Sequence, residues 1–308
     1  MTRVAAFDCG TNSLRLLVAD VECDRLTDVV RRMEVVRLGE GVDRTGRISD
    51  EALARTLRVV RAYGSECARL GVEASRFVAT SASRDASNAD EFVAGVREAL
   101  GLEPEVVAGT EEAALSFVGA TTGVVGGGTT CVVDLGGGST ELVVGESSVR
   151  AAHSMDVGCV RLTERHLTGD PPTQAEIDAA ATDVEGALDA AERDVPLADV
   201  RTLVGVAGTV TTVTAHALGL GRYDPAAIHG ARLPVEQVLA ACEQLLRMPR
   251  EERAALGFMH PGRVDVIGAG ALVWSQVVRR VAAASGVTEV VASEHDILDG
   301  IALGLAAR

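Results

Sequence analysis

Apolar residues follow two patterns along the chain, and the two patterns alternate. Short valine-rich runs predict strands, because β-branched side chains suit a pleated surface. Three strands are predicted within 3–37, and others at 76–80, 106–107, 129–145, 149–155, 200–206 and 289–292. Longer amphipathic or apolar segments predict helices that end near Leu70, Leu100, Asp194, Leu218, Ala284 and Ala307. Strands that alternate with helices in this way are typical of the α/β class.

Some predicted helices also carry a recognisable start. Ser49 is a good N-cap for the helix to Leu70, and Ser87 and Asn88 can cap the helix to Leu100. Thr173 with Glu176 matches a capping box. Thr110 is the expected N-cap of a helix whose first turn holds two glutamates. Residues 81–84 are expected to form a loop beyond a strand, and the chain from Leu233 onward is expected to be helical.

The stretch 129–145 predicts a hairpin with a glycine-rich tip. An apolar run leads into Asp134, and a second apolar run follows Glu141; between them the turn consists of Gly136, Gly137, Gly138, Ser139 and Thr140. Glycines expose backbone N–H groups, and a concavity of such donors suits phosphate oxygens. Asp134 and Glu141, at the shoulders of the turn, offer the hard oxygen ligands that Mg²⁺ prefers. A glycine-rich hairpin with solvated carboxylates is the alternative.

The N-terminus repeats this hairpin. Asp8 precedes Asp134 by 126 positions, and the same offset relates Gly10 to Gly136 and Ser13 to Ser139. A repeat of that length indicates two related halves rather than a solenoid. We expect the two tips to face each other across a cleft and to clamp a phosphate chain, with Asn12, Ser13 and Arg15 as contacts. Asp8 is expected to hold metal-bound water, and a turn-capping role is its alternative.

The length of 308 residues favours two domains. We place them at 1–122 and 123–295, with the glycine-rich segment 123–130 as the passage between them. The net charge of −15 argues against a nucleic-acid partner, which requires a basic surface. No lysine occurs in the sequence, and this excludes a Walker-type phosphate loop.

The spacing of cysteines and histidines and the length of the apolar runs argue against metal-binding, disulfide-rich and membrane-spanning proteins. The six cysteines have no Cys-x-x-Cys spacing, so neither a zinc site nor a disulfide framework is predicted. The six histidines share no ligand spacing and are expected to be structural. No apolar run reaches the roughly 20 residues needed to span a bilayer, and no signal peptide is evident. We therefore expect a soluble cytoplasmic protein without a membrane partner.

Several motifs together resemble a known family. The paired Asp-x-Gly tips look like the phosphate loops of the actin-like superfamily. The segment 134–141 is similar to the signature of the exopolyphosphatase/guanosine pentaphosphate phosphohydrolase (Ppx/GppA) family, and the segments 80–88, 109–115 and 205–212 agree with it in order. The resemblance runs from Val4 to the C-terminus. It implies two actin-like (ribonuclease H-like) α/β domains, with the last helix, 296–308, packing back on the first.

The resemblance also assigns roles. Acidic residues in a first helical turn are ordinary, yet the family's catalytic glutamate corresponds to Glu112, which would orient and deprotonate the attacking water. Asp134, Glu141 and Asp8 would hold Mg²⁺, with Mn²⁺ as the alternative. Further phosphate contacts are expected at Arg84, Gly208, Thr209 and Arg263. For each of three of these residues a structural role is the alternative. It is a surface ion pair with Asp85 for Arg84, capping of a helix for Thr209, and a place at the start of a helix for Arg263.

The implied activity is release of terminal orthophosphate from inorganic polyphosphate. Longer members of the family carry an additional helical domain, which we do not expect in this chain, and we therefore expect short polyphosphate chains to be preferred. A homodimer is implied by the resemblance alone. Hydrolysis of guanosine pentaphosphate, with binding of guanosine tetraphosphate or pentaphosphate, is the nearest alternative. An actin-like kinase or ATPase, or a non-enzymatic sensor of guanosine alarmones, is more distant.

Overall fold

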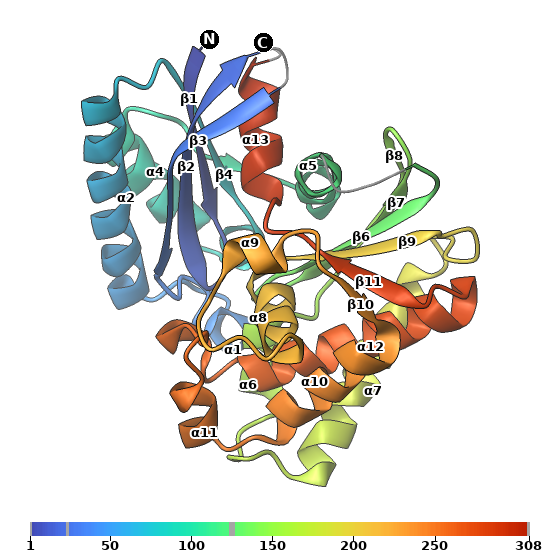
Figure 1. Cartoon of the computed structure of the whole chain (residues 1–308). Coiled ribbons are helices and arrows are strands. Elements are labelled where there is room, and N and C mark those ends of the chain that lie inside the picture. Colours follow the sequence, from blue (N-terminus) through green and yellow to red (C-terminus); the bar gives the residue numbers. More distant parts are fainter. Residues whose placement is uncertain (1, 23–24, 123–126, 307–308) are drawn as a thin grey trace. The chain divides into compact units, whose positions relative to one another are not determined.

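The computed structural model describes residues 2–22, 25–122 and 127–306, and the chain forms two compact units (Figure 1). Unit 1 comprises Met1–Gly119 and Ile297–Arg308, and unit 2 comprises Ala120–Asp296. Each unit contains one mixed β-sheet with helices packed on it, so the predicted α/β class is confirmed. Part of the glycine-rich passage predicted at 123–130, residues 123–126, lies outside the described residues.

The sheet of unit 1 has the order β3-β2-β1-β4-β5. Its strands are β1 (Thr2–Cys9), β2 (Ser13–Glu22), β3 (Arg25–Val35), β4 (Ala74–Ala79) and β5 (Glu105–Val106). The first three strands are antiparallel neighbours, whereas β4 and β5 run parallel to β1. The carboxyl ends of β1, β4 and β5 therefore lie at one edge of the sheet, where ligands of α/β sheets usually bind.

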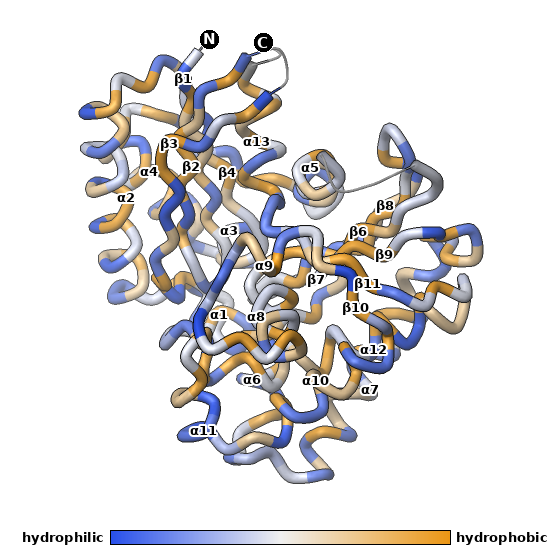
Figure 2. Tube along the Cα trace, in the orientation of Figure 1, coloured by the Kyte–Doolittle hydropathy of each residue, from blue (hydrophilic) through white to orange (hydrophobic). Residues whose placement is uncertain are grey.

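The helices of unit 1 are α1 (Val42–Thr45), α2 (Asp50–Leu70), α3 (Ser81–Asp85), α4 (Ala89–Leu100), α5 (Gly109–Thr121) and α13 (Ile297–Ala306). The predicted cap of α2 is confirmed, since Ser49 Oγ accepts from Ala52 N. Successive turns of α2 change between orange and blue in Figure 2, as expected for a helix with one buried face. Helix α13 covers the sheet face formed by residues such as Val4 and Leu17.

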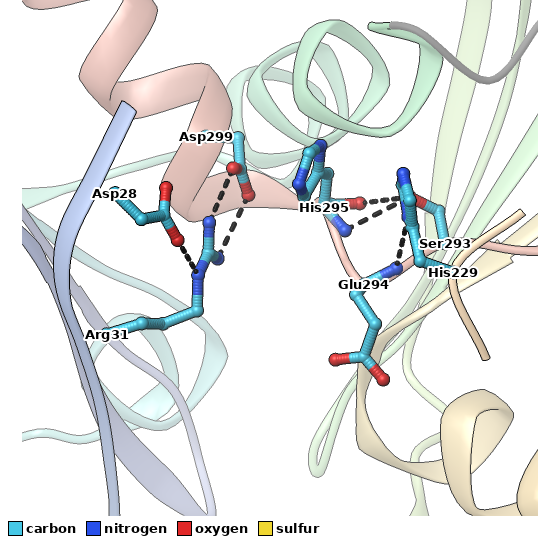
Figure 3. Close-up of polar contacts among 7 residues, drawn as sticks. All are labelled: Asp28, Arg31, His229, Ser293, Glu294, His295 and Asp299. Carbon is cyan, nitrogen blue, oxygen red and sulfur yellow. Dashed lines mark hydrogen bonds and ion pairs between the residues drawn. The ribbon is translucent and has the colours of Figure 1, made fainter. Parts of the chain in front are cut away.

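A buried carboxylate ties α13 to the sheet (Figure 3). Asp299 accepts two hydrogen bonds from Arg31 on β3, at 2.7 and 3.2 Å, whereas the more exposed Asp28 accepts one at 2.9 Å. We expect Asp299→Ala to lower the free energy of unfolding by about 2–3 kcal/mol, because it leaves Arg31 without its buried partner. Asp28→Ala is the matched control and should cost under about 1 kcal/mol, since that carboxylate is largely hydrated. Urea unfolding measures both, and equal losses would contradict this role of Asp299.

The sheet of unit 2 has the order β8-β7-β6-β9-β11-β10. Its strands are β6 (Thr130–Leu135), β7 (Thr140–Gly145), β8 (Val149–Met155), β9 (Thr202–Val206), β10 (Arg232–Pro234) and β11 (Glu289–Ala292). The pairing is antiparallel from β8 to β6 and parallel from β6 through β9 to β11, as in unit 1. The predicted duplication is thus present in the strand order, and β10 is an additional antiparallel edge strand of unit 2.

The helices of unit 2 surround a core built on α12. They are α6 (Cys159–Arg165), α7 (Gln174–Ala191), α8 (Ala207–Ala217), α9 (Pro225–Ile228), α10 (Val235–Arg247), α11 (Arg250–Ala255) and α12 (Ile267–Ser285), with a 3₁₀ turn at Pro261–Arg263. Trp274 of α12 is fully buried and lies so close to Gly205 of β9 that a Cβ there would come within 2.7 Å of its ring. Glycine at position 205 is therefore a packing requirement.

The predicted capping box at the start of α7 is confirmed. The Glu176 carboxylate accepts from the backbone N–H of Thr173, Thr168 and Gly169 and from two threonine hydroxyls. These bonds, first that from Thr173 N, lower the pKa of Glu176 to about 2. A depressed pKa contributes stability that is present above the ordinary value of 4.5 and is lost as the pH falls through about 2.

We therefore expect Glu176→Gln to destabilise the protein near neutral pH and the difference from wild type to shrink as the pH falls. Urea midpoints from about pH 7 to about pH 3 measure this trend. Glu185→Gln, an exposed change on the same helix, should shift the midpoint little at any pH. If the urea midpoint of Glu176→Gln stayed below that of wild type by the same amount at every pH, the lowered pKa of Glu176 would be refuted.

Four local predictions are wrong. Residues 81–84, expected as a loop, form the helical turn α3, and the segment after Leu233 begins with β10 before it becomes helical. Helix α5 begins at Gly109, so Thr110 is not its N-cap. Asn88 precedes α4 without capping it, because its side chain instead bonds the backbone of Ile48 in both directions. In these cases the local sequence pattern did not decide the structure, because a tertiary contact or an earlier start of the helix prevailed over it.

None of the described helices combines the length and apolar character needed to cross a membrane.

Candidate active site

Unit 1 places Asp8 and Arg15 opposite each other at the carboxyl end of β1. They are register partners on β1 and β2, and Arg15 donates to Asp8 Oδ2 from Nε at 2.8 Å and from Nη2 at 2.6 Å. Asp8 is almost fully buried. The turn between the strands is closed by Gly10 N donating to Ser13 O at 3.0 Å. Its Asn12 carbonyl accepts from Val36 N and Arg37 N, so the first tip is held by the chain that follows β3.

Unit 1 also brings Arg84 and Glu112 together. Arg84 ends the α3 turn beyond β4, and Glu112 lies in the first turn of α5 beyond β5. Arg84 Nη1 donates to Glu112 Oε2 at 3.2 Å and to Val107 O at 3.0 Å. These bonds connect Arg84 to the start of α5 and to the residue that follows β5. Only 7% of the Glu112 surface is exposed, so its carboxylate is held in a fixed direction by a cation.

The neighbouring Glu111 has a different environment. Its side chain is half exposed, and Arg76 Nη2 donates to its Oε1 at 2.7 Å. Arg76 also binds Glu105, so it ties the start of α5 to β5. Glu111 is therefore part of a peripheral ion-pair group, and Glu112 is the glutamate of this turn that is buried beside Arg84.

Unit 2 places two carboxylates opposite each other at the second tip. Asp134 and Glu141 are register partners on β6 and β7, and both are buried, with 6% and 1% of their surfaces exposed. Ser154 Oγ on β8 donates to Glu141 Oε1 at 2.7 Å. The turn is closed by Gly136 N donating to Ser139 O at 3.0 Å, the counterpart of the bond in unit 1. The predicted hairpin of 129–145 is confirmed.

The difference between the two tips lies at one equivalent position. Arg15 of unit 1 and Glu141 of unit 2 are related by the offset of 126, and each faces the aspartate of its own tip. In unit 1 the aspartate is neutralised by a cation within the protein. In unit 2 two carboxylates are directly opposite, and like charges at this spacing repel each other. The donor set of the second tip therefore fits a hard divalent metal ion.

A third group lies where β9 passes into α8. Arg263 Nη1 donates to Gly208 O at 3.2 Å, and a Cβ at position 208 would overlap the guanidinium, 2.1 Å from its Cζ. Ala207 has a positive φ of 70°, an unfavourable conformation for alanine that is typical of functional turns. Helix α8 begins at Ala207, so Thr209 lies inside its first turn and does not cap it.

Thr209 packs against Gly270 of α12 and Cys159 of α6. Burial raises the pKa of the Cys159 thiol to about 11, so this thiol is neutral and serves packing. The register pairs Asp134 with Val206, and Ala207 and Gly208 come next in the chain. The second tip and the Gly208 turn thus share one edge of the sheet in unit 2, at the carboxyl ends of parallel strands.

Two histidines of unit 2 take part in hydrogen bonds with the backbone. In unit 2, His229 Nδ1 accepts from Glu294 N at 3.2 Å, and Ser293 Oγ donates to His295 O at 2.8 Å (Figure 3). Within the described ranges, no three His, Cys, Asp or Glu side chains gather closely enough to hold a metal ion by themselves.

Sequence reasoning missed the residues that support these groups. Ser154 binds Glu141, Arg76 binds Glu111, and Arg161 Nε donates to Gly138 O at 2.7 Å. All three are distant in sequence from the residues they hold. The available sequence signal for Arg161 was Gly158 shortly before it, because a glycine permits a close approach of two backbones.

Comparisons with known proteins show the family of the chain. A family model described as the Ppx/GppA phosphatase family matches residues 17–304. The chain is 50% identical over 317 residues to exopolyphosphatase 2 of Mycobacterium tuberculosis, covering 99% of both chains. It is 30% identical over 252 residues to a guanosine-5'-triphosphate,3'-diphosphate pyrophosphatase of Aeromonas salmonicida, covering 82% of this chain and 51% of that one. A crystal structure of an exopolyphosphatase-like protein matches with a TM-score of 0.95 and 48% identity, over 98% of this chain and 97% of that one.

Proposed function

The chain belongs to the Ppx/GppA phosphatase family, and we propose that it is an exopolyphosphatase that releases terminal orthophosphate from inorganic polyphosphate by attack of water. The structural observation that supports this is the buried Glu112 carboxylate held by Arg84. The proposal is also supported by the relative named exopolyphosphatase 2, to which the chain is 50% identical over its full length.

Glu112 would act as the general base. A carboxylate fixed in direction can accept the proton of a water molecule and orient it toward the terminal phosphorus. Phosphoryl transfer depends mainly on positioning and on neutralisation of charge, so one base beside a cation suffices for the chemistry. Arg84 is placed to fix the base and to bind a phosphate oxygen with its remaining donors.

Asp134 and Glu141 would hold a divalent cation, which we propose to be Mg²⁺, with Mn²⁺ as the alternative. Two buried carboxylates leave several positions of an octahedral ion for water and phosphate oxygens, as Mg²⁺ sites commonly do. The bound ion would neutralise charge that develops on the transferred phosphoryl group. Asp8, already paired with Arg15, would hold metal-bound water rather than bind a metal ion directly.

The remaining predicted residues would bind phosphate oxygens. The tip residues Asn12 and Ser13 offer donors in unit 1, and the backbone of the second tip, residues 136–139, offers them in unit 2. Gly208 and Thr209 expose amides of the first turn of α8, with Arg263 beside them. A cytoplasmic location and a homodimer are further parts of the proposal, and the homodimer rests on the family resemblance alone.

Hydrolysis of guanosine pentaphosphate is the second candidate, supported by the relative of 30% identity. Phosphate release should be measured with Mg²⁺ on polyphosphates of defined length, guanosine pentaphosphate and ATP. We expect the highest kcat/KM on polyphosphate, and we expect no phosphate release from any substrate without a divalent ion. Preference for the guanosine substrate would favour the second candidate, and ligand binding without turnover would refute both.

A further inference from the structure

Three carbonyl groups of the second tip, those of Gly136, Gly137 and Gly138, accept hydrogen bonds from helix α6. Gly136 O accepts from Cys159 N at 3.1 Å, and Gly137 O accepts from Val160 N at 2.9 Å and Arg161 N at 3.1 Å. The third carbonyl, Gly138 O, accepts from the Arg161 side chain, Nε, at 2.7 Å. The free N–H groups in the first turn of α6 thus donate to carbonyls of the glycine loop, and no side chain caps the helix.

This arrangement sets the direction of the loop's amides. In a trans peptide the C=O and N–H groups point in opposite directions. Each carbonyl held by α6 therefore turns the next N–H, those of Gly137, Gly138 and Ser139, to the side of the loop away from the helix. Three successive amides on one side form a concave site for an anion.

The contact between loop and helix is tight. A Cβ at Gly158, the residue before α6, would lie 2.4 Å from Gly137 O and 2.8 Å from the Gly138 carbonyl carbon. The loop therefore packs directly on the backbone at the start of α6, and Arg161 is the side chain that completes this contact.

Unit 1 provides an internal comparison. Thr11 O, equivalent to Gly137 O, accepts from Gly39 N at 2.9 Å. Asn12 O, equivalent to Gly138 O, accepts from two backbone amides, Val36 N at 3.0 Å and Arg37 N at 2.8 Å. Both tips thus have the same carbonyls anchored from behind. In unit 2 the last anchor is a guanidinium, which a single substitution can remove.

We infer that Arg161 is a positioning residue of the phosphate site: its guanidinium fixes the Gly138–Ser139 peptide so that Ser139 N–H faces a phosphate oxygen. This inference rests on the proposed function of the loop. Without the anchor the peptide can rotate, and the third donor of the cradle is lost. Residues that orient direct ligands typically contribute 10–100-fold, so we expect Arg161→Met to lower kcat/KM on polyphosphate by about 30-fold.

Two further changes separate the hydrogen bond from charge and from folding. Arg161→Gln keeps a donor without the charge and should lose less than Arg161→Met. Guanidinium ions at low concentration should partly restore Arg161→Met, while its urea midpoint stays near that of wild type. Arg165→Ala, on the exposed side of the same helix, is the control and should leave kcat/KM unchanged.

Binding of tripolyphosphate, measured by titration calorimetry, distinguishes this inference from the proposed function. Weaker binding to Arg161→Met than to wild type supports the inference even if wild type releases no phosphate, an outcome that would refute the exopolyphosphatase proposal alone. Wild-type binding and turnover in Arg161→Met would overturn the inference. Equal losses in the Met and Gln variants, without rescue, would also overturn it, because charge or folding would then be responsible.

Discussion

Glu112→Gln is expected to lower the rate of phosphate release by about 10³-fold while the protein stays folded. General bases contribute roughly 10²–10⁴-fold, and glutamine cannot accept the proton of the attacking water. The change is nearly isosteric, and its amide oxygen can still accept from Arg84 Nη1, which lies 3.2 Å from Glu112 Oε2. We therefore expect kcat to fall, KM to change little, and the urea midpoint to remain near that of wild type.

Glu111→Gln is the matched control, because it removes the adjacent carboxylate on the same helical turn. Glu111 is half exposed and bound to Arg76, so this change should reduce stability slightly and leave kcat within about threefold of wild type. A phosphate-release assay on both variants compares them directly. If Glu111→Gln were the inactive variant, or if Glu112→Gln kept full activity, the assignment of the base would be wrong.

The two tips could be predicted from the sequence because their information is local. Asp, glycine and serine at fixed spacing, between valine-rich runs, specify a hairpin whatever surrounds it. The duplication followed from the constant offset of 126, and the strand orders of the two units confirm it. Helix caps that act within four residues, such as Ser49 and the Thr173 box, were also predictable.

The partners of the candidate residues could not be predicted, because they depend on tertiary packing. Arg84 was equally compatible with Asp85, its neighbour, but its hydrogen bonds go to Val107 and Glu112. Asn88 had the residue type of a cap, yet it bonds the backbone of Ile48. Arg161 lies 23 residues from the carbonyl that it holds. No pattern in the neighbouring sequence encodes these contacts.

The duplication also shows how one hairpin design serves two purposes. Unit 1 places Arg15 opposite Asp8, and unit 2 places Glu141 opposite Asp134 at the equivalent position. The side chains of directly opposite residues in such a pair lie about 5 Å apart at Cβ, so two carboxylates there repel each other. Under the proposed function, the sequence difference at this one position would decide which tip binds a metal ion.

Glu141→Gln should accordingly raise the Mg²⁺ concentration for half-maximal activity by at least about 100-fold, because even residues behind a metal ligand contribute 10–100-fold. Ser154→Ala removes only the hydroxyl that donates to Glu141 at 2.7 Å and should give a shift of about 10-fold. Glu141→Arg copies the Asp8–Arg15 pair and should abolish metal-dependent activity while it preserves the fold, since it replaces the repulsion with an ion pair.

Asp156→Asn is the control, an exposed carboxylate just beyond β8 in the same unit, and should leave the metal requirement unchanged. Mg²⁺ titrations of phosphate release measure all four variants, and urea unfolding with and without Mg²⁺ gives a second readout. Wild type should gain stability from the ion, because a ligand that binds only the folded state shifts the equilibrium toward it, and Glu141→Arg should gain none. A Glu141→Arg protein that Mg²⁺ stabilised as much as wild type would place the metal ion elsewhere.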